Sequence, residues 1–124
     1  MKIKTNELTG KPLDYAVAVA EGYTPFTDGI AWIVDVGGTY TQLFKYSSKW
    51  VAGGPIIERE RICVGWAYPR TVAEETQAVA SYFEPIHSAL ETHRMFGPTP
   101  LIAAMRCYVA SKLGDEVEVP EELK

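Results

Sequence analysis

The stretch FGPTPLIAAMRCYVASKLG, residues 96–114, decides the fold because it holds a complete set of helix start and stop signals. Thr99 is a predicted N-cap, and Pro100 falls at the first helical position, where a missing N–H costs little. Lys112 lies in the predicted last turn, and Gly114 follows as the left-handed terminator. Because the residues between these signals are apolar on most faces, the stretch predicts a central helix packed on several sides.

The length, composition and net charge of the chain exclude several classes of protein. The chain has 124 residues, of which 47% are hydrophobic and 23% charged, as is typical of one soluble globular domain. A formal net charge of -4 argues against a protein that binds bulk nucleic acid, but it leaves room for a small anionic ligand held by a few arginines. No segment has the length and hydrophobicity of a membrane span or signal core, so we expect no membrane partner. Cys63 and Cys107 lack metal-ligand spacing, and we expect two reduced thiols that fill core space.

A helix and a hairpin are predicted in the first part of the chain. Apolar residues at helical spacing predict a helix at 10–21, with Asp14 and Glu21 on its exposed face. Alternating β-branched and aromatic residues predict strands at 30–36 and 39–46, joined by a two-glycine turn. The opening residues KIKT favour a short strand or an extended lead-in.

The segment 47–62 is less regular, and two interpretations stay open. Gly53-Gly54-Pro55 is typical of a sharp turn, and the following IIERER fits either a strand or a short helix. We favour a short helical turn at 55–60 that leads into a strand at 62–68.

Helical signals follow that strand. Thr71 and Glu74 form a capping box, Pro85 interrupts the helix that it opens, and helical spacing then resumes. The pattern therefore predicts helices at 72–83 and 86–96.

Strands in the middle of the chain with helices at both ends predict one α+β domain over residues 1–124. The hairpin and the strand at 62–68 would form a small antiparallel sheet of about three to four strands, packed against the central C-terminal helix. The N-terminal helix and a helical 71–96 segment would surround it. Residues 115–124 would form a partly ordered acidic tail, in which Val117 and Val119 add an edge strand and the rest frays.

Three segments resemble the NinX-like proteins of tailed phages and prophages. They are ELTGKPLDYAVAVAEG (7–22), the W and GGPIIERERI of 50–62, and GPTPLIAAMRCYVASKLGDEVEVP (97–120), together a little under half of the chain. In that family a glycine commonly follows the IERE turn, where this chain has Arg61. The resemblance implies a phage origin and expression in the host cytoplasm, and it implies no settled activity.

One candidate site lies on the central helix. The helix start exposes N–H groups and a partial positive charge that can hold a phosphate or carboxylate, with the Thr99 hydroxyl as a further donor. Arg106, two turns along, could add a fork of donors. In the alternative, Thr99 is only a cap and Arg106 forms an ion pair with a carboxylate at the core edge, such as Glu58.

A second candidate site surrounds the Gly53-Gly54-Pro55 turn. Trp50 could stack on a base, the backbone N–H groups of the turn near Gly54 could bind an anion, and nearby arginines could neutralise it. The site residues expected here are Trp50, Gly54, Glu58, Arg59 and Arg61, with Tyr46 as a second stacking surface. In the alternative, this is a surface turn with weak ion pairs between Glu58 and Arg61.

No catalytic or metal-binding constellation is apparent. His87 and His93 are badly spaced for one helix face, and no cysteine or acidic pair completes a metal set. We therefore expect a non-enzymatic phage protein without a cofactor, which binds a small anionic, nucleotide-like ligand as a homo-oligomer in the host cytoplasm. Its most concrete form is a counter-defence sponge that sequesters a nucleotide-derived immune signal of the host. The alternative is a protein–protein interaction module for a replication or recombination factor, which an exposed aromatic patch with Trp50 and Trp66 would favour.

Overall fold

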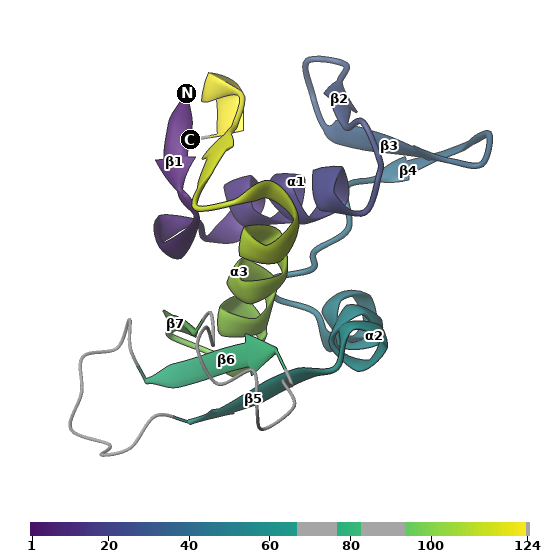
Figure 1. Ribbon diagram of the computed structural model, residues 1–124. Coiled ribbons are helices and arrows are strands. Elements are labelled where there is room, and N and C mark those ends of the chain that lie inside the picture. The colour runs from purple at the N-terminus through teal and green to yellow at the C-terminus, as the bar shows by residue number, and fades with distance from the viewer. Residues whose placement is uncertain (67–76, 83–93, 124) are drawn as a thin grey trace.

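The predicted central helix is the element around which the other elements pack. A computed structural model describes residues 1–66, 77–82 and 94–123, and α3 occupies Pro100–Leu113 within it (Figure 1). The Thr99 hydroxyl accepts a hydrogen bond from the Ile102 N–H at 3.1 Å, and Pro100 is the first helical residue. Gly114, with φ of 91°, ends the helix. The predicted start and stop signals of this helix are thus confirmed.

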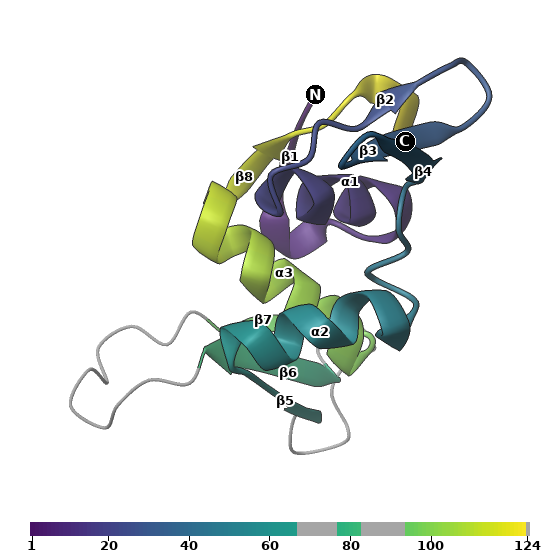
Figure 2. The same ribbon diagram turned by 90° about the vertical axis from the view of Figure 1, so that its right-hand side faces the viewer.

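The elements gather at the two ends of α3. The strands β5, β6 and β7 and the helix α2 lie near its start, whereas α1, β1 and β8 lie toward its end (Figures 1 and 2). The helix is buried by both groups, and its buried residues are Leu101, Ala103, Ala104, Met105, Arg106, Cys107, Tyr108 and Val109. A helix with so little exposed surface joins the two halves of the core.

Both termini of the chain pack against this core. β1 (Lys2–Lys4) pairs antiparallel with β8 (Glu116–Glu118), and the 3-10 turn η1 (Thr5–Glu7) leads into α1 (Gly10–Ala20). Regular structure continues in the acidic tail as far as Leu123. The 3-10 turn η4 (Glu121–Leu123) buries Leu123, and the apolar residues of the tail therefore hold it in place.

The predicted hairpin forms, with shorter strands. β2 (Phe26–Thr27), β3 (Trp32–Val36) and β4 (Thr39–Gln42) make an antiparallel sheet in that order. The second strand ends at Gln42, and Tyr46 lies in a turn that leads toward the next helix.

The Gly53-Gly54-Pro55 segment is helical, contrary to the predicted sharp turn. The helix α2 runs without a break through Trp50–Glu60, so the predicted helical turn at 55–60 is its second half. A Cβ at Gly53 would lie 2.6 Å from the Tyr46 carbonyl oxygen and 2.7 Å from Leu101 Cδ1. This glycine therefore allows α2 to approach its neighbours closely, a constraint set by residues distant in sequence. Arg61 ends α2 with φ of 56°, in the left-handed region that glycine favours.

A third sheet includes the described parts of the segment that was predicted to be helical, 71–96. β5 (Ile62–Trp66), β6 (Ala78–Tyr82) and β7 (Met95–Gly97) pair antiparallel in that order, so the strand predicted at 62–68 does not join the hairpin. The predicted helices are wrong for 78–82 and 95–96, and the capping box lies outside the described residues. Alanine favours helices, but Ala78 and Ala80 face α3, where small buried side chains allow close packing of sheet and helix.

The α+β class is confirmed, since residues 1–66, 77–82 and 94–123 form three small antiparallel sheets and a C-terminal helix packed on one of them. Cys107 is buried as expected, whereas Cys63 is exposed on the edge strand β5, which corrects the prediction of two core thiols. Within the described ranges, none of the helices has the length and hydrophobicity needed to cross a membrane.

The close approach at Gly53 can be tested with two alanine substitutions on the same helix. Gly53→Ala should lower the free energy of unfolding by about 1–3 kcal/mol, because the new Cβ collides with backbone and with Leu101. Gly54→Ala is the matched control, since its Cβ would meet only Trp50 Cε3 at 3.8 Å. It should be neutral or stabilise by up to about 1 kcal/mol. Urea unfolding measures both, and equal effects would contradict the packing role of Gly53.

Candidate ligand-binding site

The predicted anion site on α3 is not built as expected. Arg106 is only 2% exposed, and its guanidinium donates to the Leu8 and Phe96 carbonyl oxygens at 2.7 Å each. Neither of these two acceptors is Glu58, the carboxylate named as an example in the alternative prediction, and Glu58 is exposed on α2. The Thr99 hydroxyl caps α3. These contacts give Arg106 and Thr99 structural roles.

The second predicted group of residues is spread along α2. Trp50 begins this helix and Arg59 lies nine positions later, so the two are separated by about 13.5 Å along the helix axis. Gly54 lies beside Trp50 inside the helix, and Glu58 and Arg61 are exposed near its far end. The structure therefore does not bring the tryptophan and the arginines into one site.

Tyr46 precedes α2 and is buried. Its ring packs edge-to-face on Phe44 with ring centroids 5.7 Å apart. This contact and its burial make it part of the core rather than an open stacking surface.

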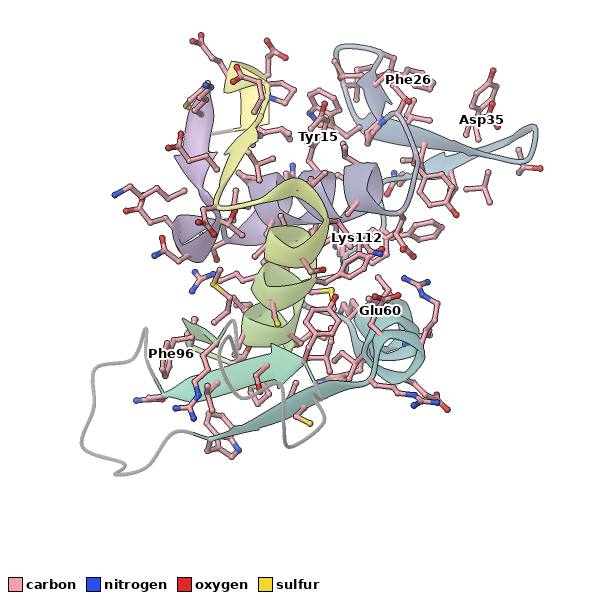
Figure 3. The ribbon with its side chains drawn as sticks, viewed as in Figure 1. Tyr15, Phe26, Asp35, Glu60, Phe96 and Lys112 are labelled. Atoms are coloured by element: carbon pink, nitrogen blue, oxygen red, sulfur yellow. The ribbon has the colours of Figure 1, made fainter. Side chains whose placement is uncertain are left out.

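Arg59 connects the ends of α1 and α2 to α3. Its two terminal nitrogens donate to the two carboxylate oxygens of Glu21 at 3.1 and 2.7 Å, and its Nε donates to Glu60 at 3.1 Å. The Tyr108 hydroxyl donates to the same Glu21 carboxylate at 2.6 Å. Glu60 is the last residue of α2 and is labelled at that helix in Figure 3. The guanidinium of Arg59 is thus already paired within the protein.

The environment of Glu21 favours its charged form. Burial opposes ionisation, but hydrogen bonds from Arg59 and Tyr108 outweigh it and lower the pKa of this carboxyl. Burial, together with its hydrogen bond to Glu21, raises the pKa of the Tyr108 hydroxyl. Contrary to the predicted exposed face, Glu21 therefore turns toward α2 and α3.

A pocket lies where sequence reasoning did not place one, between the first turns of α1 and the β3–β4 hairpin with the turn after it. Its volume is about 510 Å³, within the range of small-molecule sites. It is lined by Gly10, Lys11, Asp14, Ile30, Ala31, Trp32, Gln42, Leu43, Lys45, Ser47 and Ser48. We call this the α1–hairpin pocket.

The walls of the α1–hairpin pocket combine charge with an aromatic ring. Lys11 and Asp14 are three residues apart and so share one face of α1. Lys45 and Ser48 come from the opposite wall, and Trp32 comes from β3. The two lysines are exposed, so their ammonium groups are available to an anion, and the indole can pack against a planar ring.

Asp14 is buried at the edge of this pocket, contrary to the prediction that it is exposed. The residue is 6% exposed, and its Oδ1 accepts a hydrogen bond from the Ser47 N–H at 2.8 Å. Burial raises the pKa of the Asp14 carboxyl, although hydrogen bonds from Ser47 and the charge of Lys45 act in the opposite direction. Asp14 therefore ties α1 to the turn that forms the other wall.

No group of three or more histidine, cysteine or acidic residues that could hold a metal ion occurs within the described ranges. His87 and His93 lie outside those ranges. The fold and the pocket thus define a small α+β domain with a polar ligand-sized pocket.

Comparison with known proteins places this domain in a family. Residues 4–112 match the family described as Bacteriophage P22, NinX, and the chain belongs to this family of phage proteins, as the resemblance predicted. A similar solved structure is the 2.0 Å crystal structure of a phage protein from Bacillus cereus ATCC 14579. It has a TM-score of 0.60 and 16% sequence identity, over 85% of this chain and 94% of that one. This likeness concerns the fold. No curated protein matches the chain.

The role of Glu21 predicts a pH-dependent effect on stability. Glu21→Gln should lower the free energy of unfolding by about 1–3 kcal/mol at pH 7, because it removes the charged acceptor for Arg59 and Tyr108. Since the folded-state pKa is lowered from 4.5, the stabilisation is present above that value and is lost as the pH falls through the lowered pKa.

Urea unfolding of both proteins at pH 7 and pH 3 measures this effect. The difference between them should be smaller at the lower pH, because protonation of the wild-type Glu21 carboxyl removes the same charged acceptor. Glu58→Gln, which changes an exposed glutamate on α2, is the matched control and should have little effect at either pH. A Glu21→Gln effect of equal size at both pH values would contradict the assigned charge.

Proposed function

We propose that the protein binds a small anionic, nucleotide-like ligand in the α1–hairpin pocket and does not transform it. The observation that supports this function is the convergence of Lys11, Lys45 and Trp32 on one pocket. Two ammonium groups suit a phosphate, and an indole suits the ring of a base. Lys11 also lies in the first turn of α1, where the positive end of the helix dipole favours an anion.

The most concrete form of this function is a counter-defence sponge in the host cytoplasm. A phage protein that sequesters a nucleotide-derived immune signal needs a binding pocket but no catalytic group. We further propose that the sponge is a homo-oligomer. Ile30 lines the pocket and is 94% exposed, so a second subunit that covered it would also cover part of the pocket lining.

A second candidate function is a protein–protein interaction module for a host or phage factor in replication or recombination. Its support is the exposure of two tryptophans, since Trp50 is 53% exposed and Trp66 is 64% exposed. Large exposed aromatic side chains are typical of protein interfaces. This function predicts a co-purifying protein partner and no binding of small ligands.

Thermal shift and calorimetry with cyclic oligonucleotides and ADP-ribose derivatives test the first function. At least one compound should bind, and Lys11→Ala combined with Lys45→Ala should weaken binding about 100-fold, given about 1.5 kcal/mol for each charged contact. Lys49→Ala is the matched control, because this exposed lysine does not line the pocket.

The fate of the ligand distinguishes a sponge from an enzyme. Heat denaturation of the complex should release the compound intact, as judged by mass spectrometry. A chemically altered product would make the protein an enzyme. Failure of every compound in the panel to bind would contradict the sponge.

A further inference from the structure

The α1–hairpin pocket contains a negative charge that an anion-binding site does not need. Asp14 is the one acidic residue among the described residues that line it. Its carboxylate lies in a wall that also presents Lys11, and Lys45 is close enough to lower its pKa. A ligand that was only an anion would be repelled by this carboxylate. The Asp14 carboxylate therefore suits an anionic ligand that also carries hydrogen-bond donors.

The carboxylate is held in a fixed position with acceptor capacity to spare. Asp14 is 6% exposed, and its Oδ1 accepts a hydrogen bond from the Ser47 N–H at 2.8 Å. An ionised carboxylate has two oxygens with about four acceptor sites, and Ser47 can supply only two donors, its N–H and its hydroxyl. Because a carboxylate accepts hydrogen bonds but cannot donate them, it selects a ligand edge made of donors alone.

Among the bases, guanine offers such an edge, with the ring N1–H beside the exocyclic 2-amino group. Adenine instead places an acceptor nitrogen beside its amino group, and that nitrogen would face the carboxylate with like partial charge. Hypoxanthine keeps the N1–H but lacks the 2-amino group. Affinity for a carboxylate should therefore fall in the order guanine, hypoxanthine, adenine.

Resting on the proposed function, we infer that the α1–hairpin pocket binds a guanine nucleotide and that Asp14 selects the base. The guanine N1–H and 2-amino group donate to Asp14, the ring packs on Trp32, and the phosphate contacts Lys11 and Lys45. The pocket volume of about 510 Å³ lies within the range for a ligand of this size.

Calorimetry of the full chain with GMP, IMP and AMP tests this inference, because the three share one phosphate and differ in the base. GMP should bind most tightly, IMP more weakly, and AMP at least about tenfold more weakly than GMP, as expected for loss of a charged hydrogen bond. Asp14→Asn should weaken GMP binding about tenfold or more and shift preference toward AMP, because an amide donates as well as accepts.

Asp35→Asn is the matched control. Asp35 also accepts a hydrogen bond from a backbone N–H, that of Gly38 at 2.8 Å, but it lies near the tip of the hairpin, away from the pocket lining (Figure 3). It should leave the affinities for all three nucleotides unchanged. Because asparagine can still accept from Ser47, the Asp14→Asn variant should keep the wild-type circular dichroism spectrum.

The possible outcomes distinguish failure of the guanine inference from failure of the proposed function. Equal affinity for the three nucleotides, or an unchanged preference in Asp14→Asn, would overturn base selection by Asp14 while leaving an anion-binding pocket. Failure of all three to bind, when an ADP-ribose derivative does bind, would overturn the guanine assignment alone. Failure of every compound would overturn both.

Discussion

The two halves of the core are held together by the buried guanidinium of Arg106. It lies within α3 and donates to the carbonyl oxygens of Leu8, 98 residues away, and Phe96, 10 residues away. Buried carbonyl groups are costly unless they are hydrogen-bonded, and an arginine has five N–H donors in a rigid fork with which to reach several of them. The position of Leu8 sets the start of α1, which forms one wall of the ligand pocket. The position of Phe96 sets β7 and thereby the edge of the third sheet.

The sequence specifies those elements whose signals are local. The start and end of α3 follow from Thr99, Pro100 and Gly114, and the periodicity of α1 is equally self-contained. Prediction fails where distant residues decide the conformation. Gly53 lies inside α2 where the helix passes too close to Leu101 for a Cβ, and Ala78–Tyr82 is a strand because it pairs with strands on both sides. Neither neighbour can be found by inspection of the segment itself.

The candidate site could be predicted only as a kind of chemistry. Sequence proximity suggested that Trp50 and Arg59 act together, but a continuous helix separates them and Arg59 pairs with Glu21, 38 residues away. The pocket instead combines Lys11 with Lys45, which come from segments that are far apart in sequence. The ELTGK segment gave one signal, a lysine at a helix start, yet nothing in it reveals the opposite wall. The sequence predicted a site with basic and aromatic side chains, but the pocket is lined by other residues of these types, Lys11, Lys45 and Trp32.

The most direct test of this account is the unfolding free energy of Arg106→Met, measured with urea. Methionine keeps much of the apolar stem but cannot donate to the Leu8 and Phe96 carbonyl oxygens. If Arg106 holds the two halves together, the free energy of unfolding should fall by about 2–4 kcal/mol. A variant with wild-type stability that had lost ligand binding would contradict the account, because Arg106 would then act on a ligand rather than on the fold.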